Sequence, residues 1–223
     1  MRKIIFTLCI LLSTSIFSQV KFGLKFSPNV SLTSVHADSA WKSNAAGMRF
    51  VGGVFADISL TDNAAFNIGL EYAPKRIGLK FNDTTSSYNL QYVQIPVGLK
   101  FFTNEFADRF KIYFLLAPNL ALKIAEKSSS GNQKYSSGDY SVDLVKYADE
   151  KKKSAFNFFD IGLNLGVGTE IRVGESTHLF GGFSYNRGLI NTINLSLDGP
   201  NGKLYKEARI NTGAINLDLG IKF

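Results

Sequence analysis

Three side chains of the kinds used in acyl-transfer catalysis occur close together between residues 34 and 38. Ser34 carries a hydroxyl, His36 an imidazole and Asp38 a carboxylate. A catalytic triad requires these groups to converge in space, and proximity along the chain does not supply that geometry. The other histidine, His178, follows a predicted turn, where a polar aromatic residue has an ordinary structural role. The sequence therefore predicts no catalytic residues and no enzyme.

Metal and cofactor chemistry have no support either. The single cysteine is Cys9 and there are two histidines, so no Cys/His cluster has the spacing of a metal site. Gly162, Gly166 and Gly168 are spaced by strand alternation, and no helix follows them as a phosphate-binding loop would require. We expect neither a metal nor a cofactor.

The longest polar segment, residues 126–153, is a candidate contact surface. It carries Tyr135, Tyr140 and Tyr147 among serine and glycine spacers, and it ends in Lys151, Lys152 and Lys153. Tyrosines supply contact area, and a lysine run can meet phosphate or an acidic partner. The alternative is a solvated loop with no partner. Long loops without a role are uncommon, so both interpretations stay open.

The elements that would carry these residues are strands, because apolar residues recur with a period of two. Residues 159–173 place apolar side chains at odd positions and Asp160, Asn164, Glu170 and glycines at even ones. Strand side chains alternate between two faces, so each such segment has one apolar and one polar face. The pattern predicts eight strands, each long enough for a tilted membrane strand, at 20–32, 47–60, 65–81, 88–103, 111–124, 155–173, 178–192 and 207–223.

One predicted strand changes phase. In 65–81 the apolar residues Phe66, Ile68, Leu70 and Tyr72 are even, whereas Ile77, Leu79 and Phe81 are odd. We expect a bulge near Pro74 and Lys75 to supply the extra residue, since proline lacks a ladder donor.

Connections between the predicted strands alternate in length. Residues 61–64, 104–110 and 174–177 are short, 33–46, 126–153 and 193–206 are long and polar, and 82–87 is intermediate. Outer-membrane barrels have short periplasmic turns and longer extracellular loops. The fold class expected is all-β, an eight-stranded antiparallel up-and-down transmembrane β-barrel.

A barrel of eight strands is just wide enough to be filled by side chains, and glycines on the inner face make room for long charged ones. An unpaired charge in such a lumen costs several kcal/mol, so a structural ion-pair network is expected there, with a conducting lumen as the alternative. The inward candidates are Lys21, Lys25, Asp57, Glu71, Lys100, Glu170, Arg172, Asp218 and Lys222.

The two ends of the chain point to export. Arg2 and Lys3 precede an apolar stretch too short to span a bilayer as a helix, which predicts a signal peptide over 1–18 and a barrel domain over 19–223. Cleavage would remove Cys9 and leave 23 basic against 18 acidic side chains, a net charge of +5. Such an excess is solubilising and can attract phosphate.

Several motifs carry a resemblance to a known family. Residues 92–101, YVQIPVGLKF, residues 160–170, DIGLNLGVGTE, and residues 185–191, YNRGLIN, resemble strands of the PorT-like outer-membrane β-barrel family of Bacteroidetes. The last strand, ending in Phe223, resembles the closing strand that the barrel assembly machinery recognises. The resemblance implies a bacterial outer-membrane location; the family's namesake is linked to gliding and type IX secretion.

We therefore expect a non-enzymatic barrel with a structural or interaction role, for example in a secretion, gliding or surface assembly. The expected partners are outer-membrane lipid and lipopolysaccharide, the assembly machinery and an unidentified protein, without nucleic acid. A narrow pore for small solutes is the alternative. A lipid-modifying enzyme, as in the barrel family of lipid A palmitoyltransferases, and a soluble ligand-binding barrel are less favoured.

Overall fold

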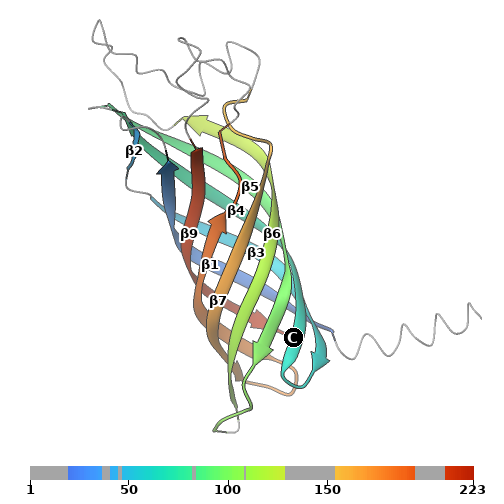
Figure 1. Ribbon diagram of the computed structural model, residues 1–223. Helices are drawn as coiled ribbons and strands as arrows, with labels where there is room; N and C mark the ends of the chain where they lie inside the picture. The colour runs from blue at the N-terminus through green and yellow to red at the C-terminus, as the bar shows by residue number, and fades with distance from the viewer. Residues whose placement is uncertain are drawn as a thin grey trace, which may run out of the picture.

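The computed structural model describes residues 20–36, 41–44, 47–81, 84–107, 109–128, 154–193 and 209–223. In these parts of the chain the regular structure is all strand (Figure 1). The strands are β1 (Val20–His36), β2 (Trp41–Ser43), β3 (Met48–Thr61), β4 (Ala64–Phe81), β5 (Thr84–Phe102), β6 (Phe110–Ser128), β7 (Phe159–Arg172), β8 (His178–Gly188) and β9 (Arg209–Lys222).

Successive long strands pair antiparallel, and β9 pairs with β1 to close the sheet. The three-residue β2 pairs with the end of β4. The result is a closed eight-stranded antiparallel barrel, which confirms the predicted fold class. Closure leaves no long unpaired edge, the condition under which strands can cross a bilayer.

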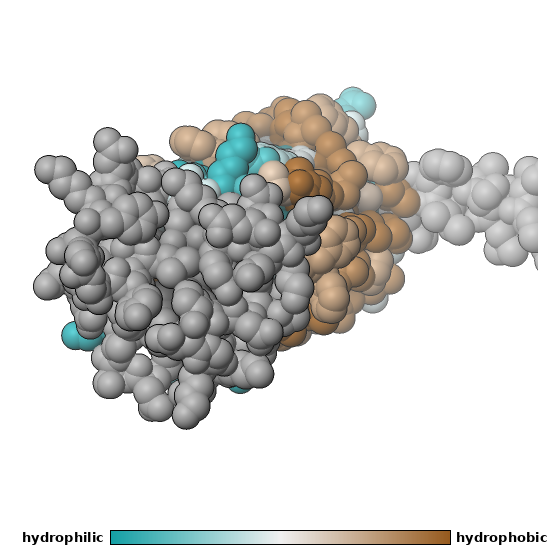
Figure 2. Space-filling model, turned by 90° about the horizontal axis from the view of Figure 1, so that it is seen from above, coloured by the Kyte–Doolittle hydropathy of each residue, from teal (hydrophilic) through white to brown (hydrophobic). Residues whose placement is uncertain are grey.

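The alternation in the sequence is the alternation between the outer wall and the lumen. On β7, Phe159 and Ile161 are 52% and 41% exposed, whereas Asp160 and Glu170 are 1% and 3% exposed. Apolar residues line much of the outer wall visible in Figure 2. Such a wall is stable against lipid and would be costly in water.

Within the described residues, no helix is long and apolar enough to cross a membrane.

The β3–β4, β5–β6 and β7–β8 connections are short and lie at one end of the barrel, where β1 begins and the chain ends (Figure 1). We call this the periplasmic end, because short turns are periplasmic in outer-membrane barrels. The opposite end is called the extracellular end.

The bulge predicted near Pro74 and Lys75 is wrong. β4 pairs with β5 in one continuous register, with Pro74 opposite Gln91 and Lys75 opposite Leu90. Odd residues of β4 from Ala65 to Leu79 face the lumen, so Ile77 and Leu79 are buried inside. The apolar pattern changes phase because the lumen becomes apolar toward the extracellular end, while the outer wall there carries Lys80.

Strand boundaries differ from the predictions chiefly at the extracellular end. β1 and β6 continue to His36 and Ser128, and β5 already begins at Thr84, so the β4–β5 connection is only residues 82–83. β7 begins later than predicted and β8 ends earlier, because residues around Phe156 and Ile193 are packed as buried residues instead of extending the wall.

Substitutions on the outward face of β9 test directly whether the outer wall faces lipid. Leu217 is exposed on that face, so Leu217→Arg should destabilise the barrel by about 2–4 kcal/mol near the bilayer midplane. Ile221→Arg is the matched control: it is on the same face of the same strand but close to the periplasmic end, where the cost falls to about 0–1 kcal/mol. Denaturant titration of the refolded protein in lipid vesicles measures both. Equal costs would contradict the assignment of a lipid-facing wall.

Candidate functional site: a filled lumen

The periplasmic half of the lumen holds a closed network of four charged side chains. Lys100 Nζ contacts Asp57 Oδ2 at 3.3 Å and also pairs with Glu170. Lys222 Nζ contacts Asp57 Oδ2 at 3.1 Å and Glu170 Oε2 at 2.5 Å. Each lysine therefore pairs with both carboxylates, and all four side chains are at most 5% exposed. Two positive and two negative groups make the network neutral, which is what a buried set of charges requires.

Aromatic rings surround Lys100. Its Nζ lies 4.3 Å from the ring centre of Tyr113, 5.4 Å from those of Phe102 and Phe180, and 5.8 Å from that of Phe55. Phe55 and Phe180 meet edge to face at 5.4 Å. The aromatic faces attract the ammonium group.

Glycines on the inner wall make the space for these rings. A side chain at Gly168 or Gly182 would come within 2.7 Å of the Tyr113 ring or hydroxyl, and one at Gly220 would meet Phe180. The sequence suggested that inward glycines leave room for charged side chains. Here they leave room mainly for aromatic ones.

A second group of polar residues fills the middle of the lumen. Lys25 pairs with Glu71, whose Oε2 accepts a hydrogen bond from Gln94 Nε2 at 2.6 Å. Asp218 accepts a hydrogen bond from the Ser27 hydroxyl at 2.6 Å. These contacts join β1, β4, β5 and β9 across the barrel.

Toward the extracellular end lie further ion pairs that were not among the predicted lumen charges. Lys75 Nζ contacts Asp160 Oδ2 at 3.0 Å, and Thr212 also bonds Asp160 at 3.1 Å. Lys123 pairs with Glu126. The alternation contained this information, since Lys75 has the parity of Glu71 and Asp160 that of Glu170. For Lys75 the presumed bulge concealed it.

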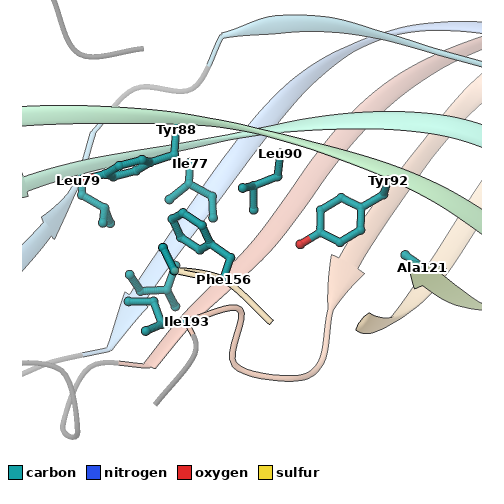
Figure 3. Packing of buried hydrophobic residues seen from close by; sticks show 10 residues of the cluster. Ile77, Leu79, Tyr88, Leu90, Tyr92, Ala121, Phe156 and Ile193 are labelled. Carbon is teal, nitrogen blue, oxygen red and sulfur yellow. The ribbon is translucent and has the colours of Figure 1, made fainter. Parts of the chain in front are cut away.

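An apolar plug closes the lumen at the extracellular end (Figure 3). We use this name for one cluster of buried residues from several strands and from the segments around residues 155 and 193: Ile77, Leu79, Tyr88, Leu90, Tyr92, Ala121, Ala155, Phe156, Ile193 and Ile210. Each is at most 3% exposed.

Two non-strand segments complete the plug. Phe156 and Ile193 form an isolated β-bridge, and Asn157 N donates to Thr192 O at 2.8 Å. The Phe156 ring packs on that of Tyr88 with centres 5.3 Å apart. The chain that enters and leaves the extracellular connections is thus tied inside the barrel.

Small hollows remain between the described side chains of the lumen. A hollow of about 180 Å³ opens near the periplasmic end beside Lys21, Glu105 and Lys222. Beyond the charge network, two hollows beside Lys25 and Glu71 measure about 20 and 30 Å³. Each of these two smaller hollows has room for about one or two water molecules.

Three of the predicted residues lie at the periplasmic end. Arg172 is the last residue of β7, and its side chain lies 3.6 Å from Glu105. It is 46% exposed because it lies at the rim, outside the filled part of the lumen. Lys21 lines the periplasmic hollow. Phe223 is 53% exposed on the outer wall, and its amide donates to Phe22 O at 2.8 Å.

The remaining candidates lie at the extracellular end or outside the described parts. Ser34 and His36 are in the last residues of β1, opposite Asn211 and Arg209, and Asp38 is outside the described residues. The loop residues Tyr135, Tyr140, Tyr147, Lys151, Lys152 and Lys153 are also outside them. Among described residues, no group of three His, Cys, Asp or Glu side chains is arranged to hold a metal ion.

The chain has a distant similarity to several solved structures. Neisserial surface protein A is 12% identical, with a TM-score of 0.48, covering 91% of this chain and 97% of its own. OprG from Pseudomonas aeruginosa is 12% identical, with a TM-score of 0.49 and coverages of 91% and 95%. Ail of Yersinia pestis is 12% identical, with a TM-score of 0.41 and coverages of 92% and 99%. No curated protein sequence matches the chain.

The sequence itself matches one protein family over residues 14–194, which is most of its length. That family is described as outer membrane protein beta-barrel domain. The match agrees with the closed barrel, its apolar outer wall and its polar lumen. This chain therefore belongs to the outer membrane protein beta-barrel domain family.

Proposed function

We propose that this protein is a closed, non-enzymatic outer-membrane barrel with a structural or interaction role, in a surface assembly such as one that serves secretion or gliding. The observation that supports this proposal most is the filled lumen. A neutral charge network occupies its periplasmic half and an apolar plug occupies its extracellular end.

The filled lumen argues against the narrow pore. An ion entering from the periplasmic end meets side chains already paired with one another, and displacing them exposes buried charge. At the other end it meets the buried side chains of the plug, each at most 3% exposed. The 20 and 30 Å³ hollows between these barriers are too small for a hydrated ion.

The interaction role is assigned to the extracellular connection between β6 and β7, because it concentrates tyrosines and a lysine run. The plug supports this assignment. It anchors the chain at Phe156 inside the barrel, so the connection starts and ends on fixed points. The PorT-like resemblance, which would suggest a secretion or gliding assembly, remains a prediction.

The test compares the protein with a variant in which residues 129–153 are replaced by a short Gly/Ser turn. Heat-modifiable gel mobility should show that both form barrels, since a flexible loop contributes only slowly varying closure entropy. Crosslinking in intact outer membranes should recover partners of the protein but not of the variant. In planar bilayers the protein should show no stepwise conductance.

Two results would overturn the proposal. Stepwise conductance of the unmodified protein would favour the pore. Recovery of every crosslinked partner with the shortened variant would place the contact elsewhere on the barrel.

A further inference from the structure

The middle of the lumen carries one more negative than positive charge. Lys25 pairs with Glu71 and also interacts electrostatically with Asp218, so one ammonium group faces two carboxylates. Both carboxylate residues are at most 5% exposed. Among the described lysine and arginine side chains, none lies within ion-pair distance of Asp218, which accepts a hydrogen bond from the Ser27 hydroxyl at 2.6 Å.

The ion pairs on either side do not correct this imbalance. Toward the periplasmic end, the network of four charged side chains is neutral in itself. Toward the extracellular end, Lys75 is paired with Asp160 at 3.0 Å. A buried charge without a partner is strongly unfavourable, so Asp218 calls for a further positive group close to it.

A hollow beside Asp218 is lined by buried amide oxygens that have no hydrogen-bond donor. They belong to Asn29, Asn164 and Asn186, which are 3%, 4% and 5% exposed. The hollow measures about 20 Å³, and the residues that line it lie on strands. Asn164 and Asn186 are directly opposite each other on β7 and β8, and Asn29 is the next inward residue after Ser27 on β1. Buried acceptors normally have a partner, so these oxygens indicate that the hollow is occupied.

The orientation of the Asn186 amide is fixed by a chain of hydrogen bonds across the lumen. The chain ends at the ionised Glu71 carboxylate, which can only accept, so Gln94 turns its amide nitrogen toward it at 2.6 Å. The Gln94 oxygen then accepts from Asn119 Nδ2 at 3.1 Å, and the Asn119 oxygen accepts from Asn186 Nδ2 at 3.4 Å. Each nitrogen in the chain is therefore used, and the Asn186 oxygen is left without a donor.

Three kinds of occupant have a suitable size, and one of them meets both requirements. A water molecule supplies donors to the oxygens but leaves the charge of Asp218 unbalanced. A proton on Asp218 balances the charge, but the new hydroxyl donates to one oxygen, whereas three lack a donor. A monovalent metal cation balances one carboxylate and attracts several oxygens at once, because hard cations prefer carboxylate and amide oxygens as ligands.

We propose that the middle of the lumen holds one dehydrated monovalent metal cation, sodium or potassium, beside Asp218 and the amide oxygens of Asn29, Asn164 and Asn186. The hollow has room for a particle about the size of one or two waters, which fits a bare ion and not a hydrated one. The sequence pointed to no metal because it was searched for Cys and His ligands, whereas this site consists of oxygen atoms.

The cation is enclosed when the barrel forms. The charge network lies on its periplasmic side and the apolar plug on its extracellular side, so the ion is held in place and not conducted. It acts as one more buried partner in the filled lumen. The site does not depend on the proposed interaction role of the extracellular connection between β6 and β7.

The test measures how the stability of the protein, refolded in phosphatidylcholine vesicles, depends on the cation in the buffer. Urea titrations, read by heat-modifiable gel mobility, are run in NaCl, KCl and choline chloride at one ionic strength, since choline is too large for the hollow. Sodium or potassium should move the unfolding midpoint to higher urea than choline does. Once the site is saturated, each tenfold rise in that metal ion should raise the folding equilibrium constant about tenfold, because one ion binds the folded barrel alone.

Two variants and a matched control locate the effect. Asp218→Asn removes the extra negative charge at nearly constant size and should abolish the advantage of the metal ion over choline. Asn164→Ala removes one unpartnered oxygen and should require about tenfold more metal ion for the same effect. The control, Glu105→Gln, removes one carboxylate from the periplasmic rim, where Glu105 is 38% exposed, and should keep the full dependence.

Equal stability of the unmodified protein in all three salts would overturn the proposal, because water or a proton would then fill the hollow. This comparison needs no variant, so it holds even if Asp218→Asn fails to fold. A metal-ion dependence that persists in Asp218→Asn would place the ion elsewhere and contradict the assignment. So would an equal loss of the dependence in Glu105→Gln.

Discussion

Replacing Lys100 by methionine should destabilise the folded barrel by about 3–5 kcal/mol, because it leaves one negative charge too many among buried groups. Lys100 pairs with both Asp57 and Glu170, and after its removal only Lys222 opposes the two carboxylates. Aromatic rings surround Lys100, and all four side chains of the network are at most 5% exposed, so the excess charge is poorly solvated. Urea titration in lipid vesicles, read by heat-modifiable gel mobility, measures the loss.

Two further variants separate charge balance from packing. Lys111→Met removes a lysine of the periplasmic rim, 30% exposed and 3.7 Å from Glu105, and should cost less than about 1 kcal/mol. Lys100→Met combined with Glu170→Gln restores a neutral network and should recover about 1–3 kcal/mol relative to Lys100→Met alone. If Lys100→Met costs no more than Lys111→Met, the lumen is hydrated and the network does not support stability.

The membrane-spanning part of the barrel could be predicted because two solvents act on each strand. Lipid outside and polar groups inside impose a period of two, which is visible along most of β7 and over residues 215–222 of β9. Inward charges such as Asp57, Lys100 and Glu170 follow from parity alone. Which lysine pairs with which carboxylate does not, because the pairs join strands far apart in sequence.

The extracellular end could not be predicted in the same way, because there the surroundings change. Above the lipid the outer wall meets water, so Lys80 faces outward while Ile77 and Leu79 face inward. If every apolar side chain of the strand is assumed to face lipid, this inversion looks like a register shift of one residue. The sequence therefore predicted a bulge near Pro74. The spacing of apolar side chains shows which face of a strand is apolar. Whether that face is the outer wall or the lumen depends on the position of the segment relative to the membrane.

The plug could not be predicted from the sequence either, because part of it comes from the segments around residues 155 and 193, which lack strand periodicity. Phe156 and Phe158 have the same residue type and similar neighbours, but Phe156 is fully buried and Phe158 is 65% exposed. Nothing in the local pattern separates them. Contacts with Tyr88 and Ile193, distant in the chain, decide which of the two packs inside.

This pair gives the second large prediction. Phe156→Ala should cost about 3–5 kcal/mol, the range for deleting a buried phenylalanine side chain, because the plug is a close-packed core and not a lipid-facing surface. Phe158→Ala should change stability by no more than about 0.5 kcal/mol, as for exposed positions. Denaturant titration in vesicles measures both variants under identical conditions.

Hydrogen exchange locates the effect of Phe156→Ala. The amides of Asn157 and Thr192 are hydrogen-bonded to Thr192 O and Ile210 O. Without the Phe156 ring they should exchange much faster, because the segment can open locally, whereas β7 amides next to Glu170 should keep their protection. If β7 lost protection to the same extent, the plug and the charged half of the lumen would unfold together. In that case the plug would be an inseparable part of the membrane barrel, and it could not hold the ends of the extracellular connections as an independent anchor.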